Sequence, residues 1–187
     1  MRLIGFSGLA RSGKDEAANA LVEAYGYQKI AFADKLREFL WEVNPYMKNR
    51  ADNTYLPLQE VFSLYGGWEQ IKDSPYYVCY RQLIQNIGTE AGRGILGKHV
   101  WIDALDNQLV MSKNYAVPDI RFKNEEDYIR SRGGLTVRIW RPGLGKINDH
   151  ASEQLSFKSQ HVIINDGSVK DLHQKVVALC DQVGEYS

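Results

Sequence analysis

The chain has 187 residues, of which 44% are apolar and 25% carry a formal charge, as is usual for one globular domain with a substantial core. Basic and acidic residues number 23 each, so no net charge attracts the chain to nucleic acid or to an anionic membrane surface. These values exclude a strongly basic polynucleotide binder and a disordered chain. We expect no nucleic acid and no membrane among its partners.

The two cysteines are far apart in the sequence and fit no metal or redox spacing, which is typical of reduced thiols. No apolar run approaches the length of a membrane span, and the first residues lack the pattern of a secretory signal. We therefore expect the chain to work in the cytoplasm.

The first fifteen residues predict a phosphate-binding loop. An apolar run from Leu3 to Phe6 indicates a buried strand, a glycine-bracketed loop follows, and a helical pattern begins directly after Lys14. In this order, backbone N–H groups, the helix N-terminus and the lysine can surround phosphate oxygens. Asp15 stands where a Mg²⁺-binding hydroxyl is usual. The alternative is an ordinary turn between strand and helix, with a solvated lysine.

The rest of the chain alternates between strand and helix patterns. Further strands are predicted at residues 27–32, 115–118, 135–140 and 161–164. Helices are predicted at residues 14–24, 35–44, 58–64, 78–92, 100–111 and 124–132, with a last helix capped by Ser168. Residues 44–75 are otherwise irregular and form either a mobile substrate-covering segment or an ordered insert.

This alternation predicts a parallel sheet with helices on both faces, whose ligands bind at the carboxyl ends of the strands. Several polar segments fall at such ends, and we expect them to converge on one crevice. They are the glycine loop, Asp119, Arg121, Arg141 and the turn at Asn165.

Phosphoryl transfer requires cations that neutralise and align phosphates, and arginine suits this task because its planar group grips phosphate through two hydrogen bonds. The candidates besides Lys14 are Arg11, Arg37, Arg81, Arg121 and Arg141. The alternative for each of these arginines, taken alone, is an ordinary solvated residue on the surface.

Four other side chains are candidates for the site. Gln85 lies one helical turn after Arg81, so the pair can hold a phosphate and read a base edge. Asp119 is a candidate Mg²⁺ ligand or general base, or else a helix cap or a partner of Arg121. His150 is either a solvated loop residue or a substrate-binding residue. Trp101 is either a core residue or a platform on which a base stacks.

Taken together, these residues resemble the bacteriophage-type deoxynucleoside monophosphate kinases, in blocks that run almost from end to end. The similar blocks are Ser7–Asp15, Ala31–Arg37, Arg81–Glu90, Val117–Glu125, Arg141–Gly143, His150–Glu153 and Ile164–Ser168. The ending Gly-Lys-Asp is the form of the loop that this family uses. The chain departs from the family at Glu16, where threonine is common, and over residues 44–75.

The resemblance implies an α/β fold of the P-loop kinase type, a three-layer α/β/α sandwich with a five-stranded parallel core sheet. One domain would span residues 1–187, with a helical acceptor-binding region at about residues 34–114 and a lid at about residues 142–160. A homodimer is compatible with the family, although no residue pattern shows an interface.

The resemblance also implies that ATP, with Mg²⁺, phosphorylates a deoxynucleoside monophosphate to the diphosphate for DNA synthesis, in the host cytoplasm if a phage encodes the chain. The ATP-binding residues would be Gly8, Arg11, Ser12, Gly13, Lys14, Asp15 and Glu16, with Asn165, Asp166 and Gly167 beside the adenine. Asp15 would hold the metal. The acceptor would contact Arg37, Arg81, Gln85, Trp101, Asp119, Arg121 and His150. The catalytic residues would be Lys14, Arg11, Asp119, Arg121 and Arg141.

Two alternatives remain open from the residues. One is a P-loop kinase of another small phosphorylated acceptor, such as phosphomevalonate or dephospho-coenzyme A. The other is a nucleotide-binding module that no longer transfers phosphate.

Overall fold

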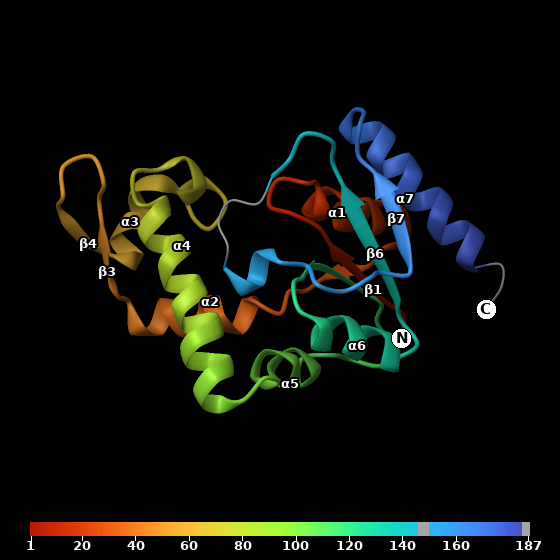
Figure 1. Ribbon diagram of the computed structural model, residues 1–187, viewed down its shortest axis with the longest axis horizontal. Helices are drawn as coiled ribbons and strands as arrows, with labels where there is room; N and C mark the ends of the chain where they lie inside the picture. The colour runs from red at the N-terminus through yellow and green to blue at the C-terminus, as the bar shows by residue number, and fades with distance from the viewer. Residues whose placement is uncertain (146–149, 185–187) are drawn as a thin grey trace. The chain divides into compact units, whose positions relative to one another are not determined.

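The computed structural model describes residues 1–145 and 150–184, which form two compact units whose elements are labelled in Figure 1. One unit combines Met1–Phe32 with Ile102–Ser187, and the other is Ala33–Trp101. Of the expected lid, residues 146–149 lie outside the described part. Among the described residues, no helix is both long enough and apolar enough to cross a membrane.

The first unit contains a five-stranded parallel sheet with the strand order β2–β5–β1–β6–β7. The strands are β1 (Leu3–Ser7), β2 (Gln28–Lys29), β5 (Tyr115–Ile120), β6 (Leu135–Trp140) and β7 (His161–Ile164). Every residue of β1 is buried, as expected for a central strand with helices over both faces. The predicted fold class, with five parallel strands, is confirmed.

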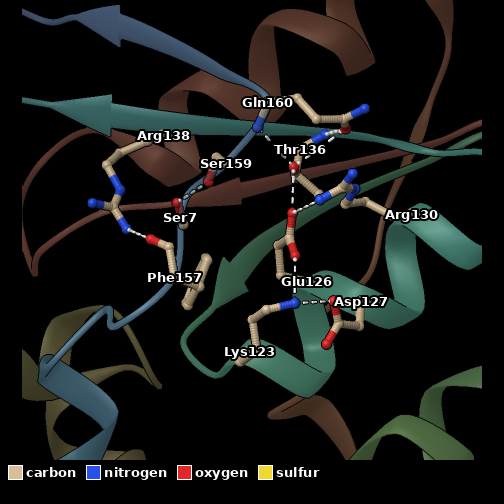
Figure 2. Close-up of polar contacts among 10 residues, drawn as sticks. All are labelled: Ser7, Lys123, Glu126, Asp127, Arg130, Thr136, Arg138, Phe157, Ser159 and Gln160. Atoms are coloured by element: carbon tan, nitrogen blue, oxygen red, sulfur yellow. Dashed lines mark hydrogen bonds and ion pairs between the residues drawn. The ribbon is translucent and has the colours of Figure 1, made fainter.

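One face of this sheet forms the apolar core with α1 (Lys14–Tyr25) and α7 (Val169–Gly184), which contact each other. Ile4 and Phe6 of β1 and Ile139 of β6 point into this core. Alternate residues point to the opposite face, where α6 (Lys123–Ser131) contacts β1 and β6. Figure 2 shows that Thr136 and Arg138 of β6 make polar contacts on that face.

Two elements are shorter in the structure than the sequence predicts. Strand β2 is only Gln28–Lys29, and the ladder ends because the N–H of Phe32 donates to the Asp119 carboxylate instead of a strand carbonyl. Helix α5 is Val100–Asp106 and does not reach residue 111, because the N–H groups of Gln108 and Leu109 bond to carbonyls three residues back. These bonds tighten the chain into the turn that leads to β5.

The second unit is built from short elements around its own core. They are α2 (Asp34–Val43), β3 (Tyr46–Lys48), β4 (Tyr55–Pro57), α3 (Leu58–Tyr65), the 3₁₀ turn η1 (Gln70–Asp73), α4 (Tyr77–Gln85) and the π-helical η2 (Asn86–Leu96). β3 and β4 pair as an antiparallel hairpin. Leu40, Met47, Val61 and Ile71 are buried together in this unit. Residues 44–75 are therefore an ordered part of a core, and the helix predicted at 58–64 is confirmed as α3.

Candidate functional site

The glycine loop turns sharply between β1 and α1. The backbone of Gly13 is left-handed, with a φ of 100°, and a Cβ added there would lie 2.6 Å from Nδ2 of Asn165. A non-glycine residue would be strained at this position and would also collide with Asn165. Lys14 is 7% exposed, and its Nζ donates to the carbonyl of Leu9 at 2.7 Å, which closes the loop on itself.

The turn after β7 packs directly on this loop. The side-chain amide of Asn165 is 8% exposed and donates to the carbonyl of Ser12 at 2.8 Å. The neighbouring Asp166 pairs with Lys175 of α7 at 2.7 Å, and the hydrogen bond from that lysine lowers the pKa of Asp166. The structure thus brings the predicted loop and the predicted Asn165 turn together at the carboxyl edge of the sheet.

The first turn of α1 carries the two acidic residues whose roles the sequence leaves open. The carboxylate of Asp15 is more than half exposed and lies 3.7 Å from Nζ of Lys29. Glu16 turns instead toward α7, where its carboxylate lies 3.6 Å from Nε2 of His173. Of the two, Asp15 has the position and exposure that fit a metal ligand beside phosphates.

Mg²⁺ in kinase sites is held by one or two carboxylates together with substrate phosphates and water. Among the described residues, no three His, Cys, Asp or Glu side chains are grouped as a metal site. A single exposed carboxylate at the end of the loop is compatible with a Mg²⁺ ion that is held mainly by substrate phosphates and water. Asp15 alone does not make a dedicated protein cage.

Asp119 lies where β5 bulges against β1. Gly5 pairs with Val117 but Ser7 pairs with Ile120, so β5 has one extra residue around Pro118 and Asp119. This bulge accommodates a proline within a central strand. It also turns Oδ1 of Asp119 toward the N–H of Phe32, at 2.9 Å.

Arg121 follows in a turn that a buried carboxylate holds. Glu125 is 3% exposed, and its Oε2 accepts the N–H groups of Arg121 at 2.7 Å and Phe122 at 3.0 Å. Sequence reasoning did not single out Glu125. The signal that could have found it is a glutamate at the third position of a helix, where it caps the N-terminus.

Arg141 and the residues around position 150 lie in the same unit. Arg141 is exposed and lines a cavity of about 210 Å³ together with Gly8 and Ser12 of the glycine loop. His150 caps the 3₁₀ turn η3 (Ala151–Glu153), because its Nδ1 accepts the N–H of Ser152 at 3.2 Å. This position gives His150 a structural role, and its contact with a substrate stays a prediction.

The acceptor residues predicted between residues 34 and 114 belong to the second unit. Arg37 pairs with Asp34 at 3.0 Å and hydrogen-bonds Tyr80, the residue before Arg81. Nη1 of Arg81 lies 3.4 Å from the hydroxyl of Tyr77. The predicted pair of arginines is therefore associated with one helix, α4, which also carries Gln85.

Trp101 is held within the second unit by two contacts. Its Nε1 donates to the carbonyl of Gly88 at 2.7 Å, and a Cβ added at Gly92 would lie 2.7 Å from its ring. These contacts fit the core alternative that the sequence left open. Base stacking by Trp101 stays a prediction.

The arrangement at the carboxyl edge of the sheet is suited to binding and aligning phosphates. It combines a left-handed glycine turn, a buried lysine, a helix N-terminus and an arginine on one cavity wall. Such a site accelerates phosphoryl transfer by position and charge and needs no covalent intermediate on the protein.

Comparisons with known proteins agree with this chemistry. Residues 63–176 match the family model of deoxynucleotide monophosphate kinase. The chain is 29% identical to a protein of Acanthamoeba polyphaga mimivirus that is provisionally named a deoxynucleotide monophosphate kinase, with 99% of each chain covered. It is 23% identical to the deoxynucleotide monophosphate kinase of Escherichia phage RB69, over 94% of this chain and 98% of the phage protein.

The fold is also similar to a solved structure. The protein TT1252 from Thermus thermophilus superposes with a TM-score of 0.50 at 17% sequence identity, with 97% of each chain covered. At this level of identity the likeness concerns the fold alone.

Proposed function

Because the chain belongs to the deoxynucleotide monophosphate kinase family, we propose that it transfers the γ-phosphate of ATP to a deoxynucleoside monophosphate. The products are ADP and the deoxynucleoside diphosphate. The observation that carries the proposal is the glycine loop with its buried Lys14, in a chain whose residues 63–176 match this family. The rival acceptors, phosphomevalonate and dephospho-coenzyme A, have no comparable support.

In this reaction the loop N–H groups and Lys14 bind the phosphates of ATP. Asp15 would hold Mg²⁺, which supplies charge neutralisation between the phosphates when it is bound. Arg37 and Arg81 bind the phosphate of the acceptor, and Asp119 and Arg121 act at the reacting groups. Each of these side chains aligns or neutralises phosphate oxygens, which is the main requirement of this chemistry.

The chain supplies precursors for DNA synthesis, and both relatives named above are encoded by viruses. We place the reaction in the cytoplasm of an infected host cell.

A coupled assay of ADP release tests the proposal, with ATP and each of the four deoxynucleoside monophosphates in turn. We expect at least one of them to raise ADP release well above the rate with ATP alone. No stimulation by any of the four would favour a binding module. Stimulation only by phosphomevalonate or dephospho-coenzyme A would favour another class of kinase.

A further inference from the structure

The face of the sheet opposite α1 and α7 holds the segment Leu155–Gln160 by polar contacts, of which Figure 2 shows those of Phe157, Ser159 and Gln160. The hydroxyls of Ser7 and Ser159 lie 2.9 Å apart, and the N–H of Gln160 donates to Oγ1 of Thr136 at 3.1 Å. The segment returns from the expected lid to β7. Polar side chains on the sheet therefore set its path.

Arg138 of β6, the strand partner of Ser7, also holds this segment. Its Nη2 donates to the carbonyl of Leu155 at 3.0 Å and to the carbonyl of Phe157 at 2.5 Å. The guanidinium also lies 5.6 Å from the centroid of the buried Phe157 ring. Leu155 has a φ of 45°, a conformation that is uncommon for leucine and persists only where its surroundings hold it. These contacts fix the plane of the guanidinium.

The charge of Arg138 has no counter-ion among the residues that the structure describes. Within the part of the chain that the structure describes, no carboxylate forms an ion pair with it, whereas Arg130 lies 3.5 Å from Glu126 and Arg132 pairs with Asp106. Its buried Nε makes no hydrogen bond to a described residue. Burial without compensation lowers the pKa of Arg138. A cation in this state is stabilised by any anion that reaches it.

Arg138 faces the cavity whose other wall is the glycine loop. The same cavity of about 210 Å³ is lined by Gly8, Leu9, Ser12 and Leu155. Ser12 is 1% exposed, and its hydroxyl has no hydrogen-bond partner among the described residues. Figure 2 shows one terminal nitrogen of Arg138 turned to the Phe157 carbonyl and the other turned away from it. Buried polar groups of this kind normally have a partner, so the cavity suits an anionic ligand.

We propose that Arg138 is a phosphate-binding residue, which contacts a phosphate group of the nucleotide held by the glycine loop. Two backbone carbonyls pre-orient the guanidinium, and its remaining donors and its charge act on the ligand. This inference rests on the proposed function, since it takes the ligand of the loop to be ATP. It adds to that site a residue that neither the sequence pattern nor the family resemblance indicated.

Isothermal titration of ATP tests the inference, with the wild-type chain, Arg138→Gln and Arg138→Lys at low and high KCl. We expect Arg138→Gln to weaken ATP binding about ten- to a hundredfold, the usual cost of losing a charged hydrogen bond. Arg138→Lys should recover part of the affinity because it keeps the charge. The loss in Arg138→Gln should be larger at low salt, since salt screens the missing attraction.

Two control variants separate phosphate binding from a purely structural role. Ser159→Ala removes one anchor of the same segment but leaves the charge in place, and Arg130→Gln removes an arginine outside the cavity. We expect both to bind ATP within about twofold of wild type with unchanged salt dependence, after circular dichroism shows that each variant is folded.

The outcomes separate the two proposals. ATP affinity within twofold of wild type in Arg138→Gln would overturn the inference and leave the proposed function standing. The inference would also be overturned if the loss of ATP affinity in Arg138→Gln did not depend on salt, was as large in Arg138→Lys and was reproduced by Ser159→Ala. If the wild-type chain binds ATP with the expected Arg138 dependence but phosphorylates no acceptor, the proposed function alone is refuted.

Discussion

At the scale of single residues, Asp119 combines an observed hydrogen bond with a proposed role in the reaction, and the two depend on different properties of its side chain. Along the edge of the sheet, the N–H groups of Gln28 and Ile30 bond to the carbonyls of Asn114 and Ala116. The next N–H in this series is that of Phe32, and it bonds to the Asp119 carboxylate. Asp119 therefore ends β2 by a hydrogen bond that needs an acceptor atom, while the proposed action on the reacting groups needs a charge.

Asp119→Asn and Asp119→Ala should distinguish these tasks. Asparagine keeps an oxygen for the N–H of Phe32, so we expect a loss of less than about 1 kcal/mol of unfolding free energy, against about 1–3 kcal/mol for alanine. Both variants should lose turnover, because both lack the charge. Urea unfolding and the coupled assay measure the two effects. Wild-type turnover in Asp119→Asn would refute the proposed role.

The placement of the candidate site residues was predictable where a local pattern marks the end of a strand. Lys14, Asn165 and Arg141 follow strands, and the structure places all three in the unit that holds the glycine loop. Arg138 was not predictable in this way. It sits inside β6, where an alternating pattern only places it on one face, and its importance depends on a segment that folds over that face from residues 155–160.

At the scale of elements, the turn from β7 into α7 shows how side chains set a helix start. The N–H of Asp171 donates to Oγ of Ser168 at 3.2 Å, and the N–H of Ser168 donates to the Asp171 carboxylate at 2.8 Å. This reciprocal pair satisfies two N–H groups that the helix itself cannot. Ser168 was predicted as the cap from sequence, and the structure confirms it.

Ser168→Ala should destabilise the protein by about 1 kcal/mol, the usual cost of losing such a cap. The hydrogen bonds from Ser168 lower the pKa of Asp171, so this contribution is present when the carboxylate is charged and is lost as pH falls through the lowered pKa. Urea unfolding at neutral and at acidic pH measures both effects. The exposed Ser131→Ala is the matched control, and equal stability of the two variants would contradict the capping role.

Elements with a strong apolar pattern were predictable, and elements fixed by polar turns were not. Strands β6 and β7 begin and end at the predicted residues, and the apolar Val137, Ile139 and Ile163 of these strands are buried. The hairpin of β3 and β4 was missed because Met47 is the only residue of β3 that is buried. Its loop is held by hydrogen bonds around Asn49, Asp52 and Thr54, which carry no periodic signal.

At the scale of the whole molecule, the chain leaves the sheet unit after Phe32 and re-enters it at Ile102. The second crossing lies within α5, so no break in the helical pattern marks its position in the sequence. The sequence therefore predicted a single domain with an acceptor region at residues 34–114, and it did not indicate that the chain forms two compact units. The second unit holds both predicted acceptor arginines, Arg37 and Arg81, and their contact with the acceptor stays a prediction.

We propose that this chain moves the γ-phosphate of ATP onto a deoxynucleoside monophosphate. The most direct measurement uses ATP labelled with ¹⁸O in the γ-phosphate, followed by mass spectrometry of the products with the preferred acceptor. We predict that the label appears in the β-phosphate of the deoxynucleoside diphosphate, and that Lys14→Ala, which removes the buried cation, lowers this transfer at least about a hundredfold. Label found only in inorganic phosphate, or transfer at the wild-type rate in folded Lys14→Ala, would contradict it.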